Sequence, residues 1–201
     1  MASATLFALF LVSALTLYPP SATAQPVTDM YGNVVRNGGR FHILPYIFSN
    51  GGGIDRIATG NETIPLTVVQ SPFETSKGLP LRITSIFRSG HIPEGSIVFV
   101  KFELIPLGDT SLEWTVVEGL PEGSVVKVSG YPNTVKGSFS IHRDSSSPDR
   151  YKLLFCNVDR SLCGNVGIAR DDAGNRLLVI TQDKPFVFVL EELASPSTAS
   201  A

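Results

Sequence analysis

The sequence predicts an all-β protein, and two features of the chain indicate this class. From residue 25 onward, short apolar and β-branched runs recur between Gly, Pro and Asn residues, and no stretch shows the apolar period of an amphipathic helix. Turn sequences separate the runs: Asn37-Gly38-Gly39, Asn50 to Gly53, Pro121-Glu122-Gly123 and Asp172 to Asn175 supply residues that tolerate a positive φ. We therefore expect short strands joined by turns and loops.

Each expected strand is rich in Val, Ile, Leu, Thr or aromatic residues and stops at a turn residue. In chain order the expected strands are Phe41–Ile47, Leu66–Gln70, Leu81–Thr84, Ser96–Phe102, Trp114–Val117, Val125–Val128, Ser138–His142, Tyr151–Phe155, Val166–Ala169, Arg176–Ile180 and Phe186–Leu190.

A weak internal repeat suggests how these strands are arranged. Segments around Phe41, Phe99 and Tyr151 resemble one another, with an aromatic anchor at similar intervals along the chain. Three equivalent units of four strands would give about twelve strands with pseudo-threefold symmetry, as in a β-trefoil. On the repeat alone, a β-sandwich remains the alternative.

The N-terminus has the features of a secretory signal peptide. An apolar stretch from Leu6 to Leu17 is followed by Pro19-Pro20 and by the small residues Ala22-Thr23-Ala24. A transmembrane helix is the rival interpretation, but the apolar stretch is shorter than the roughly 20 residues that a bilayer requires. We expect residues 1–24 to be removed and the mature chain to start near Gln25.

The rest of the chain has the length of one domain, which we place at residues 25–193. The tail 194–201 is rich in Ser, Ala and Thr and is expected to be disordered. Lys and Arg are scattered along a chain with a formal net charge of −2, so neither nucleic acid nor an anionic membrane is expected as the main partner.

A set of spaced residues past the leader resembles the plant Kunitz protease inhibitors of the soybean trypsin inhibitor type. The resemblance begins with Val27, Asp29, Gly32, Val35, Phe41 and Ile43, with Phe41 where the family usually has Tyr. It continues through Gly60-Asn61-Glu62, Pro65 to Gln70, Glu113-Trp114, Leu120 to Gly123 and Asp183-Lys184-Pro185. It therefore covers almost the whole mature chain, with Trp114 on a core strand and no binding role.

The resemblance implies a β-trefoil, which is a six-stranded barrel capped by three hairpins. It also implies a secreted, monomeric inhibitor of trypsin-like serine proteases that needs no cofactor and no metal, with an extracellular or vacuolar destination. The reactive loop of the family aligns with Ser85, Ile86, Phe87, Arg88, Ser89 and Gly90, and the bond presented to the protease is Arg88-Ser89. An Arg at this position suits enzymes that have a carboxylate at the base of the specificity pocket.

Two further residues acquire roles from the resemblance. Asn37 matches the Asn that braces the loop in the family, and its amide is expected to hydrogen-bond the carbonyls around Ile86 and Arg88. Phe87 is expected to fill a neighbouring apolar subsite, with a place in the core as the alternative. Without the resemblance, Arg88 would be an ordinary solvated Arg and Asn37 an ordinary turn residue. Gly90 makes the loop backbone freer than a strong inhibitor requires.

The cysteines and one sequon predict two covalent modifications, a disulfide and a glycan. Cys156 and Cys163 are expected to form a disulfide in an exported chain. The family usually has an earlier second disulfide, but Ile64 occupies its first position and the segment from Glu103 to Leu112 contains no Cys. Asn61, in Asn61-Glu62-Thr63, is a candidate glycan acceptor.

An enzyme is not expected, because no nucleophile elbow, zinc motif, phosphate loop or dinucleotide fingerprint occurs. His42, His91 and His142 lie in three different segments. Two other functions stay open: a trefoil of this family that has lost inhibition and serves in storage, defence or ligand binding, and an inhibitor of another protease class that acts through Asn157 to Arg160.

Overall fold

The computed structural model describes residues 24–193, except residues 48, 65, 104–111, 129, 130, 146 and 148. The predicted signal peptide, apart from its last residue, and the predicted tail lie outside the described residues, as does Pro65. Every regular element in the described part is a β-strand, which confirms the all-β prediction. None of the described segments forms an apolar helix of the length needed to span a bilayer.

The strands are short and are listed here with their bounds: β1 (Arg40–Pro45), β2 (Ile54–Ile57), β3 (Thr67–Gln70), β4 (Leu81–Ser85), β5 (Ile97–Phe102), β6 (Trp114–Leu120), β7 (Gly123–Val128), β8 (Thr134–Val135), β9 (Gly137–Arg143), β10 (Tyr151–Asn157), β11 (Cys163–Arg170), β12 (Arg176–Thr181) and β13 (Phe188–Glu192). The sequence predicted most of them but missed β2 and β8. In β2, Asp55 and Arg56 interrupt the apolar pattern, and pairing with β3 supplies what local propensity lacks.

Six strands close into a barrel in the order β13-β1-β4-β5-β9-β10, and β10 pairs with β13 to complete the ring. The closing contact joins Tyr151 to Phe188, and both residues are almost fully buried. The buried Tyr151 hydroxyl accepts a 2.8 Å hydrogen bond from the backbone N–H of Thr28. Closure leaves no free sheet edge in the barrel, so the loops between strands can vary without exposing one.

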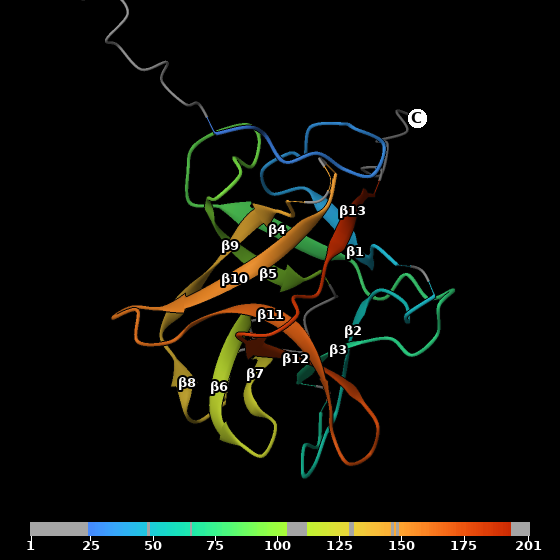
Figure 1. Cartoon of the computed structure of the whole chain (residues 1–201), viewed down its shortest axis with the longest axis vertical. Coiled ribbons are helices and arrows are strands. Elements are labelled where there is room, and N and C mark those ends of the chain that lie inside the picture. The colour runs from blue at the N-terminus through green and yellow to red at the C-terminus, as the bar shows by residue number, and fades with distance from the viewer. Residues whose placement is uncertain are drawn as a thin grey trace, which may run out of the picture.

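Three hairpins cap one end of the barrel: β2–β3, β6–β7 and β11–β12 (Figure 1). They meet through the pairs Leu177–Val69, Val179–Val125 and Thr67–Lys127. Val69, Val125, Leu177 and Val179 form a buried cluster to which all three hairpins contribute. The barrel and its cap confirm the β-trefoil and rule out the sandwich.

The middle aromatic anchor of the predicted repeat, Phe99, was wrong. Phe41 and Tyr151 are fully buried, but Phe99 is 44% exposed. Strand β5 alternates its side chains, with Val98, Val100 and Phe102 facing the core and Phe99 facing outward. Aligning the aromatic residues had shifted the strand by one residue, and a one-residue shift exchanges the two faces.

Candidate functional site

The segment after β4 forms an exposed loop that leads to β5 (Figure 1). Ser85, the last residue of β4, is buried, whereas Ile86 and Phe87 are 49% and 53% exposed. Arg88 and Gly90 are also exposed and Ser89 is partly buried. The exposure of Phe87 excludes the alternative that it belongs to the core.

The side chain of Asn37 binds this loop from below. Its Nδ2 donates hydrogen bonds to the carbonyl oxygens of Phe87 and Ser89, at 2.9 and 3.1 Å, and makes a longer 3.5 Å contact with that of Ser85. Its Oδ1 accepts a 2.8 Å hydrogen bond from the backbone N–H of Ser85. A single amide therefore holds backbone groups on both sides of Arg88.

The acceptors are alternate residues along a loop that bends at Ile86 and Phe87. The carbonyl oxygens of Ser85, Phe87 and Ser89 all face the Asn37 amide. Two of these acceptors belong to the residues immediately before and after Arg88.

The N-terminal segment runs beside the loop and binds it along its length, as the two neighbouring traces in Figure 1 show. The backbone N–H of Asn37 donates to the carbonyl of Gly90 at 3.1 Å. Beyond it, Ile92 donates to Val35 and Val27 donates to Ile92. Val27, Val35 and Ile92 are fully buried, so this segment is anchored in the core. Gly90, which has no positive φ, is itself held by this pairing.

A hydrogen bond and two ion pairs stabilise the turn that contains Asn37. Gly38 has a φ of 77°, a conformation that glycine adopts without strain. Its carbonyl accepts a 2.7 Å hydrogen bond from Arg82, and Arg82 and Arg40 both form ion pairs with Glu103. Partial burial raises the pKa of Glu103, but hydrogen bonds from Arg82 and Arg40 outweigh it, so that the pKa lies below its usual value.

A second polar contact lies after the Arg88-Ser89 bond. Ser89 Oγ is 3.1 Å from His91 Nδ1 and accepts a 3.4 Å hydrogen bond from the backbone N–H of His91. His91 pairs with Arg36 in an isolated bridge. The loop thus has polar contacts after the Arg88-Ser89 bond as well as beneath it.

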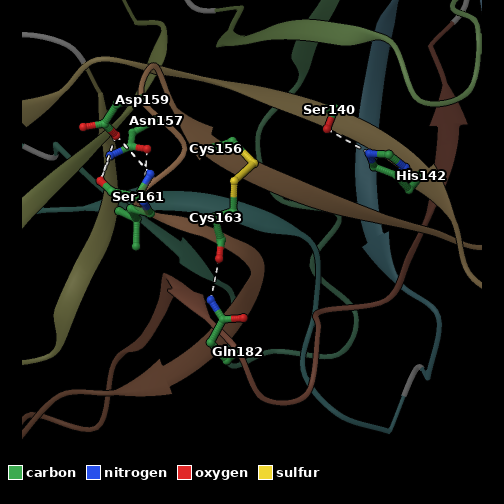
Figure 2. Close-up of a disulfide and its surroundings, with 9 residues drawn as sticks. Ser140, His142, Cys156, Asn157, Asp159, Ser161, Cys163 and Gln182 are labelled. Carbon is green, nitrogen blue, oxygen red and sulfur yellow. Dashed lines mark hydrogen bonds between the residues drawn. A yellow bond between two sulfur atoms is a disulfide. The ribbon is translucent and has the colours of Figure 1, made fainter.

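The hairpin between β10 and β11 contains the disulfide Cys156–Cys163 (Figure 2). Within the turn, Asp159 Oδ1 accepts hydrogen bonds from the backbone N–H and the hydroxyl of Ser161 at 3.0 and 2.8 Å. These bonds lower the pKa of Asp159. In the same turn, Asn157 Nδ2 donates a hydrogen bond to Ser161 Oγ, and Asn157 Oδ1 accepts one from the backbone N–H of Leu162. Arg160 adopts a φ of 60°, which gives this turn a conformation unlike that of the loop at Arg88.

The sequon lies beside a buried ion pair. Asn61 and Thr63 are exposed, whereas the side chains of Glu62 and Lys127 are 7% and 5% exposed and 2.5 Å apart. Burial raises the pKa of Glu62, but hydrogen bonds from Lys127, Tyr131 and Thr67 prevail and lower it to about 2. Burial and the Glu62 carboxylate raise the pKa of Tyr131.

The histidines are not grouped for catalysis or metal binding. His42 lies on β1 and His142 on β9, where burial lowers the pKa of each. His142 Nε2 is 2.9 Å from Ser140 Oγ on the same strand (Figure 2). Among the described residues, no three His, Cys, Asp or Glu side chains lie close enough together to hold a metal ion.

The fold and the loop together define a class: a β-trefoil that displays an exposed Arg on an internally braced loop. Residues 27–192 match the family model of the legume Kunitz type, described as trypsin and protease inhibitor. The chain belongs to this family.

Its relatives include inhibitors of two serine proteases. A Kunitz-type trypsin inhibitor of Glycine max is 42% identical over 206 residues, covering 99% of this chain and 100% of the relative. A chymotrypsin inhibitor of Erythrina variegata is 45% identical over 180 residues, covering 86% and 99%. Among solved structures, the soybean trypsin inhibitor in complex with porcine pancreatic trypsin has a TM-score of 0.78 and 39% identity, covering 85% of this chain and 100% of that chain.

Proposed function

We propose that this protein inhibits trypsin-like serine endopeptidases with a substrate-like loop. The loop presents the Arg88-Ser89 bond to the active site and stays bound there. One observation carries the proposal: Arg88 is exposed on a loop whose carbonyls at Phe87 and Ser89 are both bound by Asn37. Family membership supports the same activity.

The chemistry of Arg88 determines the class of target. A guanidinium forms bidentate, charge-assisted hydrogen bonds with a carboxylate, which is the group at the base of the trypsin specificity pocket. Enzymes with an apolar or small pocket would have to bury the charge without a partner, which is costly. Trypsin-like enzymes are therefore the expected targets.

The brace explains how a cleavable bond can inhibit. Asn37 contacts the residue before Arg88 and the residue after it, so cutting Arg88-Ser89 leaves both new chain ends attached to the same amide. The new amine stays next to the acyl carbonyl, where re-formation of the bond competes with departure. A loop already ordered also avoids much of the cost of binding, about 0.5–1.5 kcal/mol for each side chain that would otherwise be immobilised.

Phe87 is placed to add apolar contact next to Arg88. More than half of its surface is exposed in the free protein, and it follows the exposed Ile86. Burial of such side chains against an enzyme contributes roughly 25 cal/mol for each Å² removed from water. We assign Phe87 to the subsite next to the specificity pocket.

The experiment is a comparison of inhibition constants for trypsin. Arg88→Ala is expected to raise the constant at least about 100-fold, because a central charged anchor commonly contributes more than 2 kcal/mol. The matched control is Arg160→Ala, which removes the exposed Arg of the disulfide hairpin and should change the constant less than about twofold.

Three outcomes decide between the candidate functions. Equal potency of the wild type and the Arg88→Ala variant would remove Arg88 from the mechanism. Loss of potency in the Arg160→Ala variant alone would place inhibition in the segment from Asn157 to Arg160. Rapid digestion of the wild type at Arg88-Ser89, without delay of the enzyme, would establish a non-inhibitory trefoil.

We also propose that the chain is exported, with cleavage after Ala24, a single domain at 25–193 and a tail at 194–201 that is free of the domain. The disulfide Cys156–Cys163 and the exposed sequon at Asn61 support an oxidising, glycosylating compartment. Intact mass and N-terminal sequencing of the protein from its natural source test the cleavage and the glycan. Gel filtration tests the monomer, and localisation of tail-deleted protein separates vacuolar from extracellular delivery.

A further inference from the structure

A pocket of about 540 Å³ lies where the end of β1 meets the turn between β11 and β12 and the segment before β13. Four cationic side chains line it, namely Arg150, Arg170, Arg176 and Lys184, and one carboxylate, Asp144. A formal excess of positive charge is thus concentrated in one hollow of a chain whose net charge is −2.

Among the described residues, none of the four cations forms an ion pair, and all the ion pairs lie elsewhere in the fold. Arg170 and Arg176 occupy directly opposite positions in the β11–β12 ladder. Like charges at opposite positions of an antiparallel pair are destabilising, so this pairing carries an electrostatic cost.

Two of the cations are held in place by neutral groups. Arg176 donates to the Gln70 side-chain oxygen at 2.6 and 3.0 Å and to the Asn50 carbonyl at 2.9 Å. Burial and the charge of Arg170 lower the pKa of Arg176. The guanidinium of Arg150 lies over the Tyr46 ring, 3.1 Å from its centroid. Neutral partners fix both guanidinium groups while leaving their charge available to a ligand.

The other two cations, Arg170 and Lys184, are exposed, and Arg170 donates a 3.2 Å hydrogen bond to the Gly174 carbonyl. Long exposed side chains of this kind can turn toward an anion that enters the pocket. Two partly buried cations with neutral partners, beside two exposed cations, suit a compact anion with several acidic groups.

We propose that this pocket binds a small polyanion that carries several phosphoryl or sulfo groups. Its volume lies within the range of about 300–1,000 Å³ that small-molecule sites occupy. Guanidinium groups match the geometry of phosphate and sulfate oxygens, and a bound anion would relieve the repulsion between Arg170 and Arg176.

The pocket is separate from the protease-binding loop. Strand β1 starts at Arg40, next to the turn of Asn37, and its last residue, Pro45, lines the pocket. Five steps of extended chain span about 16 Å. The anion site therefore adds a second binding function to the proposed inhibitor and does not depend on Arg88.

Isothermal titration at low ionic strength tests the proposal, with inorganic tripolyphosphate and sucrose octasulfate as the two probes. We expect one-to-one binding of at least one probe to the wild-type protein, and weaker binding as NaCl is added. Binding of tripolyphosphate alone identifies phosphoryl ligands, and binding of sucrose octasulfate alone identifies sulfated ones.

Matched variants locate the site. Arg170→Gln with Lys184→Gln is expected to weaken binding about tenfold or more, because both charges face the ligand. Lys101→Gln with Lys136→Gln removes the same charge from exposed positions elsewhere and should weaken binding less than about threefold. Absence of binding by both probes, or equal weakening in the two double variants, would overturn the proposal. Because all four substituted side chains are exposed, the control variant should unfold at the wild-type temperature. The Arg170→Gln, Lys184→Gln variant should be at least as stable as the wild type, since it loses the repulsion between Arg170 and Arg176.

Discussion

Substitution of Asn37 by Ala separates a braced loop from one that is merely exposed. The change removes three hydrogen bonds of 2.8 to 3.1 Å between the Asn37 amide and the loop backbone. A typical hydrogen bond contributes about 0.5–1.5 kcal/mol net, so the three together stabilise the bound loop conformation by about 3 kcal/mol. The buried N–H of Ser85 would also lose its acceptor.

Most of this free energy should appear as a weaker inhibition constant for trypsin. Without the brace the loop must be ordered when the protease binds, which adds about 2–3 kcal/mol to the cost of association. Since every 1.4 kcal/mol is a factor of ten, the inhibition constant for trypsin should rise about 30- to 150-fold. Cleavage at Arg88-Ser89 should also become faster, because the new ends are no longer held together.

The assay measures the inhibition constant with a chromogenic substrate and follows loop cleavage by mass spectrometry. The control is Asn157→Ala, which removes two comparable side-chain hydrogen bonds from the turn of the disulfide hairpin. It should leave both measurements within about twofold of wild type. A folded Asn37→Ala variant with unchanged inhibition would refute the role of the brace.

Two other predictions concern stability. The pKa of Glu62 is about 2 in the folded protein, against 4.5 ordinarily. The ionised carboxylate therefore stabilises the protein by about 3 kcal/mol above pH 4.5, and this contribution is lost as the pH falls toward 2. Denaturant titrations at several pH values should show that loss in the wild type and in a Glu118→Gln control, but much less of it in Glu62→Gln; parallel curves for all three would contradict the assignment. Replacing Cys156 and Cys163 together by Ser should lower the free energy of unfolding by about 2.5 kcal/mol, the loop-entropy value for so short a ring, and leave trypsin inhibition intact. A folded double variant that inhibits trypsin more weakly than the wild type would show that the disulfide hairpin takes part in binding.

The strand pattern was predictable because it is local. Alternation of buried and exposed side chains and the turn glycines determine most strands, and Trp114 lies in the core as expected. Where the alternation is weak, prediction failed. Strand β2 has only Ile54 buried and is defined by its pairing with β3. Strand β8 has only two residues and is defined by its pairing with β6.

The contact between Asn37 and the loop could be predicted only through the family resemblance. Asn37 and Phe87 are far apart in the sequence, and no local pattern indicates that an amide before two glycines binds a distant loop. The basic pocket shows the opposite case. Its four cations are scattered from Arg150 to Lys184, so charge patterning along the chain gave no sign of it. Only the fold brings them together.

The loop is braced by polar contacts in a chain that lacks the earlier disulfide usual in its family. The turn of Asn37 is held by Arg82, and Arg82 is held by Glu103, which also pairs with Arg40 at the start of β1. These contacts connect the start of β1, strand β4 and the residue that follows β5. A covalent bond restricts mainly the unfolded chain, whereas this polar network acts on the folded loop, where inhibition requires rigidity. The loss of the disulfide therefore lowers the expected stability of the domain more than its expected affinity for a protease.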